Sequence, residues 1–542
     1  MASDRSDDAE RSGRRWMRAM AIGIAIASIA LLVMASSHFN QTYDEETHLA
    51  AGLNWWQYGR SDVDQVHPPL ARIFIALGPA LDGVRLHGHA TVWLQGNAAL
   101  LAGGHYHRTL ALARAGVLPF FVLLLAVVWA WTRALADERA ALLAVALTAA
   151  TPPLLAHAGI ATNDLPLAAM VTWAFYALVR WLERPDVPRT TVLAIAGGGA
   201  VVTKLSSIPF FGLGAILIIA ARFLLSRRRN GRDPSLLARA YLRPLVGASV
   251  GAGLLVWATY GFHVHLARGW LPVPAPELLA GIRALARNNG AGRPAYLLGN
   301  ISKFGWWYYF WVVLAVKTPL PLMMLSLIAL VWTLAARAQR SDWRSLAPWL
   351  AVGAIMTVAS ASNIDIGVRH ILPVYPLLIV PAAIAAIRLW DATGPARRPL
   401  VRSALGALVL GQAVTTIRTY PDFLPAFNAF AGAHPDRVLL DSNLDWGQDL
   451  YRLADTLQAR RIDAVTLFYF GSTPVGAFPL ADTVRIGGAE RASGWIGVSR
   501  TFVHGLYSTC FTWISAYRPV ARIGQSMLLY HLLPDTVARI PR

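Results

Sequence analysis

Long apolar runs recur along this chain, and they restrict its fold more than any other feature. Eleven runs lie at about residues 17–37, 109–131, 140–155, 165–180, 190–203, 206–223, 245–262, 319–336, 346–361, 370–387 and 401–417. A helix needs about 20 apolar residues to cross the ~30 Å hydrocarbon core of a bilayer. Only 15% of the residues are charged, well below the roughly one quarter of soluble domains. The sequence therefore predicts a polytopic α-helical membrane protein with about eleven transmembrane helices.

The distribution of basic residues predicts the orientation. The net charge is +19, which in a soluble protein would suggest nucleic acid. Here the arginines gather in connections between apolar runs, most densely over residues 222–243. This is the positive-inside pattern of cytoplasmic loops. We therefore predict no nucleic-acid partner, a cytoplasmic N-terminus, and a first run retained as a membrane span instead of a cleaved signal peptide.

In this topology two sizeable segments lie at the outer face, and we divide the chain into two domains. Residues 1–417 form the transmembrane domain, whose long outer loop, at about 38–108, includes an amphipathic piece at 69–81 expected along the interface. Residues 418–542 read as a small extracytoplasmic α/β domain. Its expected elements are strands at 438–442, 464–470, 494–499 and 526–532 and a helix at 447–461. The single Cys510 excludes an intramolecular disulfide and a cysteine-based metal site.

The strongest candidate for chemistry is the segment YDEETHLAAGLNWWQYGRSDVDQVHPPL at residues 43–70. Its acids follow directly on the first apolar run, and ionisable groups beside a bilayer are costly and usually functional. Asp44 or Glu45 could act as a general base. The alternative is that these acids only complement a helix N-terminus, with Thr42 as the cap. The two interpretations are compatible, and we favour function.

The predicted topology brings further unusual ionisable residues to the same outer face. Asp164, in TNDLPL, could equally be part of a helix cap with Asn163. Basic residues that face acids at a membrane surface suit a substrate that carries a phosphate, although each alone could anchor a lipid headgroup. His67, in HPPL, could be a substrate ligand or merely a hydrogen-bonded polar residue. The gathered set is Asp44, Glu45, His67, Asp164, Lys204, Arg293, Lys317, Asp365 and Arg369.

Several motifs together resemble a known class. DEETHLAAG followed by HPPL, TNDLPL and GVRHILPVYPLL is similar to the integral-membrane GT-C glycosyltransferases. Within that class it resembles the branch of protein mannosyltransferases and aminoarabinose transferases, which depend on a phospholipid carrier. The tail, FNAFAGAHPDRVLLDSNLDWGQDL followed by GWIGVS, resembles the soluble domain of a bacterial subgroup. The resemblance covers nearly the whole chain.

The resemblance implies an activity and a location. A polyprenyl-phosphate-linked sugar would be the donor for an inverting transfer at the outer face of the bacterial inner membrane. The acceptor hydroxyl, on a protein, a glycolipid or a cell-envelope glycan, is not specified by these residues. Membrane lipid is the other expected partner. No cofactor is required by the sequence, and use of a divalent metal stays open.

The resemblance also implies residue roles. Asp44 would be the catalytic base, Glu45 would support it, and Asp164 matches the second acid of the class. The donor phosphate would contact Arg369, Lys204, Lys317 and His67, although His67 stands where the aminoarabinose branch has lysine, which weakens its role. Contacts to acceptor or sugar are expected from His48, Arg293, Asp365, His370 and Trp446.

Other interpretations stay open. The same acids could bind a lipid-linked sugar in a transporter or flippase, but the sequence shows no inverted repeat of the kind common in transporters. The chain could also be a scaffold recruited through its outer domain. Within that domain Asp441, Asn443 and Asp445 could touch acceptor sugar, but we favour a cap of the following helix by Asp441, Ser442 and Asn443.

Overall fold

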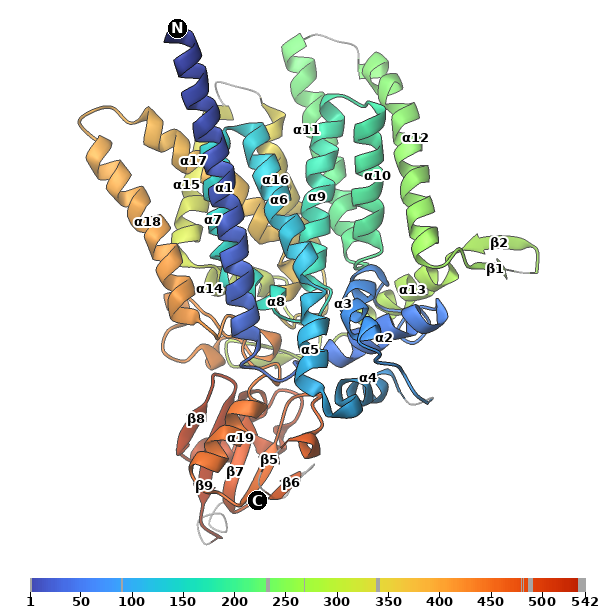
Figure 1. Ribbon diagram of the computed structural model, residues 1–542, viewed down its shortest axis with the longest axis vertical. Coiled ribbons are helices and arrows are strands. Elements are labelled where there is room, and N and C mark those ends of the chain that lie inside the picture. Colours follow the sequence, from blue (N-terminus) through green and yellow to red (C-terminus); the bar gives the residue numbers. More distant parts are fainter. Residues whose placement is uncertain are drawn as a thin grey trace.

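A bundle of long, roughly parallel helices carries a small mixed domain at one end (Figure 1). The computed structural model describes residues 2–88, 91–230, 234–267, 269–337, 342–478, 480, 482–485 and 491–534. Residues 231–233, within the predicted basic connection, lie outside the described residues.

Helices occupy all eleven predicted apolar runs. They are α1 (Ala2–Ser36), α5 and α6 (Tyr106–Ala115 and Leu118–Leu135), α7 and α8 (Glu138–Ala149 and Pro152–Ala158), α9 (Asp164–Glu183), α10 (Val187–Val201), α11 (Ser207–Asn230), α12 (Pro234–Thr259), α15 (Leu320–Arg337), α16 (Trp343–Ser360), α17 (Val374–Ala392) and α18 (Arg398–Thr419). Among the described residues, seven helices are long and apolar enough to cross a membrane, or up to nine if each of two bent pairs is one span. The predicted fold class is confirmed, whereas the count of eleven is not.

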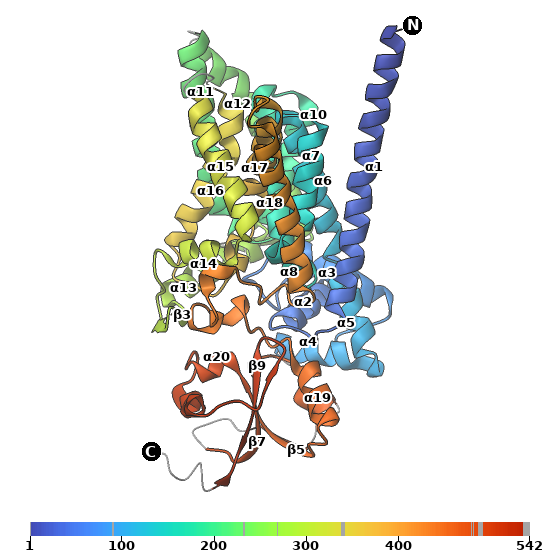
Figure 2. The ribbon, with the colours of Figure 1, turned by 90° about the vertical axis from the view of Figure 1, so that its left-hand side faces the viewer.

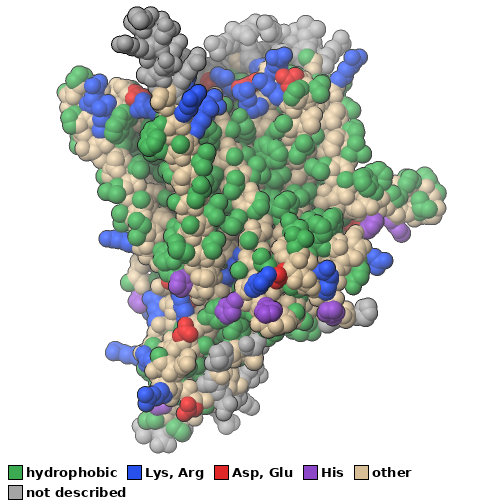
Figure 3. Space-filling view, in the orientation of Figure 1, with side chains coloured by type: hydrophobic (Ala, Val, Ile, Leu, Met, Phe, Trp, Pro, Cys, Tyr) green, Lys and Arg blue, Asp and Glu red, His purple; other side chains and the backbone are tan. Residues whose placement is uncertain are grey.

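Two of the apolar segments are bent. Helices α7 and α8 meet at 65°, and the short helix α14 (Tyr309–Lys317) meets α15 at 114°. Both breaks precede a helix that has proline in its first turn, where the missing N–H costs nothing. The side of the bundle in view has a broad band nearly free of charged side chains. Lys and Arg gather at the rim beside the N-terminus, away from the mixed domain (Figure 3).

Short helices fill the space between the bundle and the mixed domain (Figure 2). They are α2 (Glu45–Tyr58), α3 (Leu70–Leu81) and α4 (Val92–Leu101), and α3 coincides with the predicted amphipathic piece. The connection between α12 and α14 contains the hairpin β1 (Val264–Ala267) and β2 (Leu271–Pro274), helix α13 (Pro276–Ala291), and the hairpin β3 (Ala295–Leu297) and β4 (Asn300–Ser302).

The C-terminal domain is built around a five-stranded mixed sheet. Its order is β6 (Asp482–Arg485), β5 (Ala464–Phe468), β7 (Gly494–Ser499), β9 (Met527–Leu532) and β8 (Ala521–Ile523). β5 is parallel to β6 and β7, and β9 is antiparallel to β7 and β8. Helix α19 (Leu450–Ala459) packs on one face and α20 (Arg500–Val503) lies by the other.

One predicted strand is wrong. Residues 438–442 do not join the sheet, because Leu439 makes only an isolated bridge to Leu297 and Asp441 has a φ of 56°. A non-glycine residue at positive φ interrupts an extended strand. Instead the chain forms a 3-10 turn at Asp441–Asn443. The other predicted strands and the helix are confirmed.

Glycine allows α2 to pack tightly against its neighbour. A Cβ on buried Gly52 would lie 2.1 Å from the carbonyl oxygen of Arg72, at the start of α3. Helix α2 carries the candidate acids at its N-terminus, so this close contact helps fix their position.

We expect Gly52→Ala to destabilise the protein by about 1–3 kcal/mol, because the added methyl group overpacks a backbone contact. The control is Gly353→Ala, at an exposed position of α16 where a Cβ meets nothing within 4 Å. There alanine favours the helix. Thermal unfolding in detergent measures both, and equal melting temperatures for the two variants would contradict this account.

Candidate active site

Asp44 stands at the N-terminal end of α2 with its side chain directed away from that helix. It occupies the N-cap position with a φ of 82° and makes no side-chain cap hydrogen bond. Its carboxylate instead accepts a hydrogen bond of 2.9 Å from the guanidinium of Arg369, and its side chain is 32% exposed. Asp44 at the N-cap position and Glu45 and Glu46 in the first turn are helix-end acids as predicted, whereas Thr42 is not the cap. A left-handed aspartate costs energy and is the kind of strain found at functional sites.

Arg369 joins two acids that lie far apart in the sequence. It sits in the 3-10 turn Val368–Ile371. Its Nη1 lies 2.9 Å from Asp44 Oδ2 and 3.9 Å from Asp164 Oδ2. The face of its guanidinium covers the ring of Trp446 at 4.4 Å. The arginine is thus held by charge on its edge and by an aromatic face beneath.

Asp164 is fully buried at the first position of α9. Its Oδ1 lies 2.5 Å from Lys204 Nζ, and Oδ2 is 3.3 Å from Thr162 Oγ1 and 3.9 Å from His157 Nδ1. Asn163 occupies the N-cap position, as the cap interpretation predicts, but its side chain makes no cap hydrogen bond. Lys204 comes from the break between α10 and α11, as its sequence position predicts.

These contacts form one network of alternating charge, which we call the charge network: Asp44, Arg369, Asp164 and Lys204. Two anions alternate with two cations, and the side chains of Arg369 and Lys204 are only 11% and 12% exposed. Buried charges need partners of this kind, because desolvation of an isolated ion is very costly. All four members are among the sequence-predicted site residues.

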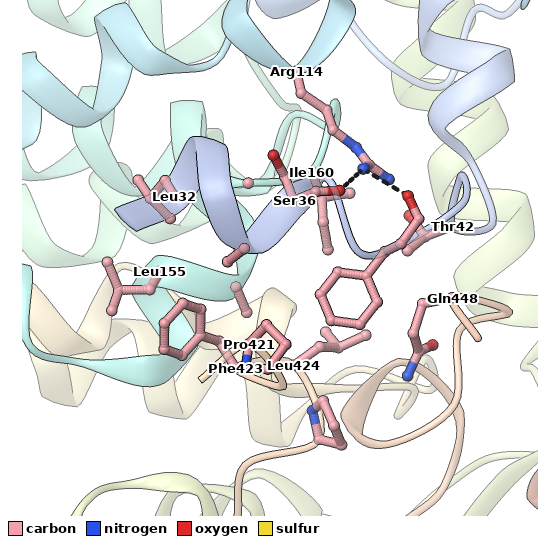
Figure 4. A pocket seen from close by; sticks show the side chains of 15 residues that line it. Leu32, Ser36, Thr42, Arg114, Leu155, Ile160, Pro421, Phe423, Leu424 and Gln448 are labelled. Carbon is pink, nitrogen blue, oxygen red and sulfur yellow. Dashed lines mark hydrogen bonds between the residues drawn. The ribbon is translucent and has the colours of Figure 1, made fainter. Parts of the chain in front are cut away.

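Glu45 has a different role from the predicted support of Asp44. Both of its carboxylate oxygens accept from the Arg114 guanidinium at 2.9 Å, and Oε1 also accepts from Ala161 N at 2.7 Å. Arg114 in turn donates to the carbonyl oxygen of Ser36 at the edge of a small, mostly apolar cavity (Figure 4). Glu45 therefore fastens the start of α2 to α5 and to the end of α1. Arg114 was missed because it lies inside an apolar run.

His48 and His67 belong to a second polar cluster beside the first. The Nδ1 of His67 lies 3.0 Å from Asp64, and Arg72 pairs with Asp64 and donates to His48 Nδ1 at 3.3 Å. His48 therefore accepts with Nδ1 and carries its proton on Nε2. Burial lowers the pKa of His48, which keeps it neutral. Although burial raises the pKa of Asp64, the Arg72 guanidinium holds it well below its usual range. Asp64 and Arg72 were not predicted.

Lys317 does not join the charge network. Its ammonium is buried and donates to the carbonyl oxygens of Leu424 and Asn443 at 2.8 and 2.7 Å, above the ring of Phe427. This arrangement ties α14 to the chain that leads into the C-terminal domain, and both of these acceptors are backbone carbonyl oxygens outside the charge network. Trp446 is 1% exposed, so its predicted contact with an acceptor sugar does not fit this structure either.

The other predicted contact residues surround the network. Arg293 is exposed, next to the 365–370 loop, where its N–H donates to Asn363 O at 3.3 Å. Asp365 accepts from Trp306 N at 2.7 Å, and burial raises its pKa to about 7. His370 follows Arg369, and burial together with the charges of Lys204 and Arg369 lowers its pKa well below the usual range.

Glu46 is a buried acid that sequence reasoning did not separate from its neighbours. Its Oε2 accepts from Ser472 Oγ at 2.8 Å, across the junction with the C-terminal domain. Burial raises the pKa of Glu46 to about 8 despite that hydrogen bond. It therefore holds a proton at neutral pH. Three consecutive acids are a signal that at least one of them must be buried or paired.

The residues do not fit the metal site that the resemblance leaves open. Within the described ranges, no group of three His, Cys, Asp or Glu side chains could hold a metal ion. Asp44 and Asp164 each face Arg369, which would repel a divalent cation placed between them.

Comparisons with known proteins bear on the fold. Residues 87–257 match the family model described as dolichyl-phosphate-mannose-protein mannosyltransferase. No curated protein sequence matches the chain. ArnT from Cupriavidus metallidurans bound to undecaprenyl phosphate is similar in structure, with a TM-score of 0.51 and 13% identity over 94% of this chain and 97% of that one. The apo state of ArnT has a TM-score of 0.50 and 14% identity over the same shares.

A third similar structure comes from an archaeon. The Archaeoglobus fulgidus oligosaccharyltransferase tethered with an acceptor peptide has a TM-score of 0.50 and 11% identity, covering 93% of this chain and 72% of that one. At such identities the likeness concerns the fold. The partial family match and the shared fold confirm the resemblance of this chain to the GT-C glycosyltransferases.

The raised pKa of Glu46 predicts a pH-dependent stability. Between its ordinary pKa of 4.5 and about 8, the folded protein keeps a proton that the unfolded chain loses. Stability therefore falls as pH rises through this window. Glu46→Gln removes this loss, so its melting temperature should exceed that of the wild type increasingly from pH 5 to pH 8. A constant difference across these pH values would contradict a buried, protonated Glu46.

Proposed function

We propose that this protein is an inverting glycosyltransferase that moves a sugar from a polyprenyl-phosphate-linked donor to an acceptor hydroxyl. The charge network carries the proposal. It places a partly exposed carboxylate, Asp44, beside two nearly buried cations at one end of a membrane bundle. A phosphate leaving group needs cations of this kind, and an acceptor hydroxyl needs a base.

The proposed reaction exchanges one C–O bond for another. The acceptor oxygen attacks the anomeric carbon of the donor, and the bond from that carbon to the phosphate oxygen breaks. The bonding electrons leave with the polyprenyl phosphate, and the hydroxyl proton passes to the Asp44 carboxylate. A single displacement from the face opposite the leaving group inverts the anomeric carbon.

The cations suit the leaving phosphate. Arg369 offers a planar fork and Lys204 a point charge, and Asp164 holds both in place from within the protein. A phosphate that takes over part of the Arg369 guanidinium competes with Asp44 for its hydrogen bond. The Asp44 carboxylate is then released towards the acceptor while the leaving group is neutralised.

An apolar cavity among the transmembrane helices offers space for the donor's lipid tail. It has a volume of about 550 Å³ and is lined by side chains of α9, α10, α11 and α12, nearly all of them apolar. Its wall on α10 includes Val201, three residues before Lys204. An isoprenoid chain in this cavity could reach the cations with its phosphate. The bound undecaprenyl phosphate of the similar ArnT structure is a lipid of this class.

The orientation forms part of the proposal. The charge network lies at the end of the bundle that carries the C-terminal domain, and the basic rim in view lies at the opposite end (Figure 3). By the positive-inside rule the basic end is cytoplasmic. The active site would then face the outer side of a bacterial inner membrane, where the sugar acceptor, whether protein, glycolipid or envelope glycan, is reached.

The proposal predicts that Asp44→Asn abolishes turnover while the donor's phosphate still binds. Purified protein is incubated with a panel of polyprenyl-phosphate sugars and candidate acceptors, with and without EDTA, and free polyprenyl phosphate is measured. We expect a loss of about 10²- to 10⁴-fold, typical of a removed general base. Asp82→Asn, whose carboxylate pairs with exposed Arg108 on the same outer loop, is the matched control.

Other outcomes of that experiment would count against the proposal. Turnover by Asp44→Asn equal to that of the control would exclude Asp44 as the base. Tight binding of one donor by all variants, without turnover of any, would instead favour a transporter or scaffold for lipid-linked sugars.

The phosphate contact predicts a second result, in binding. Lys204→Met should weaken the affinity for undecaprenyl phosphate by about 10- to 100-fold, the value of a charge-assisted hydrogen bond. Lys303→Met is the control, because Lys303 lies over the ring of Phe304 away from the network. Equal affinities of the two variants would remove Lys204 from the phosphate site.

A further inference from the structure

The C-terminal domain sends one segment, Asp441 to Trp446, into the transmembrane domain. We call it the DSNLDW segment. Ser442 Oγ donates to the carbonyl oxygen of Ile366 at 2.6 Å, and the N–H of Val368 donates to Asn443 Oδ1 at 2.9 Å. These two bonds bracket Gly367, where an added Cβ would lie 2.2 Å from Ser442 Oγ. The segment is therefore hydrogen-bonded to the backbone immediately before Arg369.

Trp446, at the end of the segment, contacts Arg369 and the residue that precedes Asp44, the other partner of the ion pair. Its ring lies 4.4 Å beneath the guanidinium of Arg369. Its carbonyl oxygen accepts from the N–H of Tyr43 at 3.0 Å. Tyr43 directly precedes Asp44. Trp446 therefore helps fix the backbone position next to Asp44 and the orientation of the guanidinium plane of Arg369.

The segment is itself anchored by buried polar groups. Asp441, at positive φ, accepts from the hydroxyl of Tyr507 and from Ser442 N. Asp445 accepts from Thr501 N at 3.2 Å, and burial raises its pKa to about 7. Just beyond the segment, Asp449 accepts from both the N–H and the hydroxyl of Ser526, at 3.0 and 2.8 Å. These hydrogen bonds connect the segment to the sheet side of the C-terminal domain. The segment is therefore held by its own domain as well as by its contacts with the transmembrane domain.

We propose that the DSNLDW segment is a positioning element of the active site, in which Trp446 and Asn443 act through Arg369 and Asp44. This inference rests on the proposed function and deepens it. The C-terminal domain is then part of the catalytic unit. Neither residue touches the reacting atoms, since Trp446 is almost completely buried and Asn443 fully so.

The physical reason lies in the freedom of an arginine side chain. An ion pair alone leaves the guanidinium free to rotate about its axis. A ring beneath its face removes that rotation. A displacement of about 1 Å at such a site can cost a hundredfold in rate, so a residue that only fixes orientation can matter as much as one that reacts.

The test compares Trp446→Leu with Trp446→Phe in the full-length protein. Leucine keeps an apolar but smaller side chain and removes the aromatic face, so we expect kcat to fall by about 10- to 100-fold. The Kd for undecaprenyl phosphate should change by less than about threefold, because both cations remain. Phenylalanine restores an aromatic face and should recover kcat to within about fivefold of the wild type. Trp495→Leu, on β7 with its ring against His531, is the matched control.

Each outcome decides between the claims. Wild-type turnover establishes the proposed function independently, and without it the inference falls as well. Given turnover, loss of kcat in Trp446→Leu no greater than in Trp495→Leu would overturn the inference. Equal losses in the leucine and phenylalanine variants, in step with their melting temperatures, would show a merely structural role. If Trp446→Leu does not fold, Asn443→Ala decides in its place: unchanged kcat in a folded variant overturns the positioning role.

Discussion

The structure depends on bringing two carboxylates and two cations together at one end of an apolar bundle. The four residues of the charge network come from four separate connections. Each charge is paired with one of opposite sign, which offsets the cost of desolvation. Removal of Asp164 takes away the ion-pair partner of Lys204 and one of the two partners of Arg369. The helix ends at α2, α9 and α11 and the 3-10 turn before α17 are therefore all fixed relative to each other by the same electrostatic requirement.

The surrounding polar structure holds this arrangement in place. The buried Glu45–Arg114 pair fastens the start of α2 to the end of α1 and to α5, and Asn40 reaches the carbonyl oxygen of Gly447 at 2.7 Å. The two domains thus meet through hydrogen bonds to buried backbone groups as well as through side-chain packing. Such bonds are directional and costly to leave unmade, which makes the junction suitable for holding a site at fixed geometry.

The sequence allowed the fold class and the four members of the charge network to be predicted, because a charge next to a long apolar run is conspicuous. Arg114 was missed because a single arginine inside an apolar run gives no sign of a site. Its partner Glu45 is 69 positions away in the sequence. The strand expected at 438–442 fails because local β-propensity contains no information about the loop of Arg369 that this segment binds. The predicted contact of Trp446 with sugar does not fit because the ring is buried against Arg369. The sequence alone does not show that this ring is already covered.

The central claim is that the cations of the charge network hold the donor's phosphate opposite Asp44. Cryo-electron microscopy of the protein in nanodiscs with undecaprenyl phosphate tests it most directly. The account predicts phosphate density within about 3 Å of both the Arg369 guanidinium and the Lys204 ammonium, with the lipid chain entering the cavity between α9 and α12. Lipid density bound elsewhere, with the Asp44–Arg369 and Asp164–Lys204 pairs undisturbed and no phosphate beside them, would contradict it.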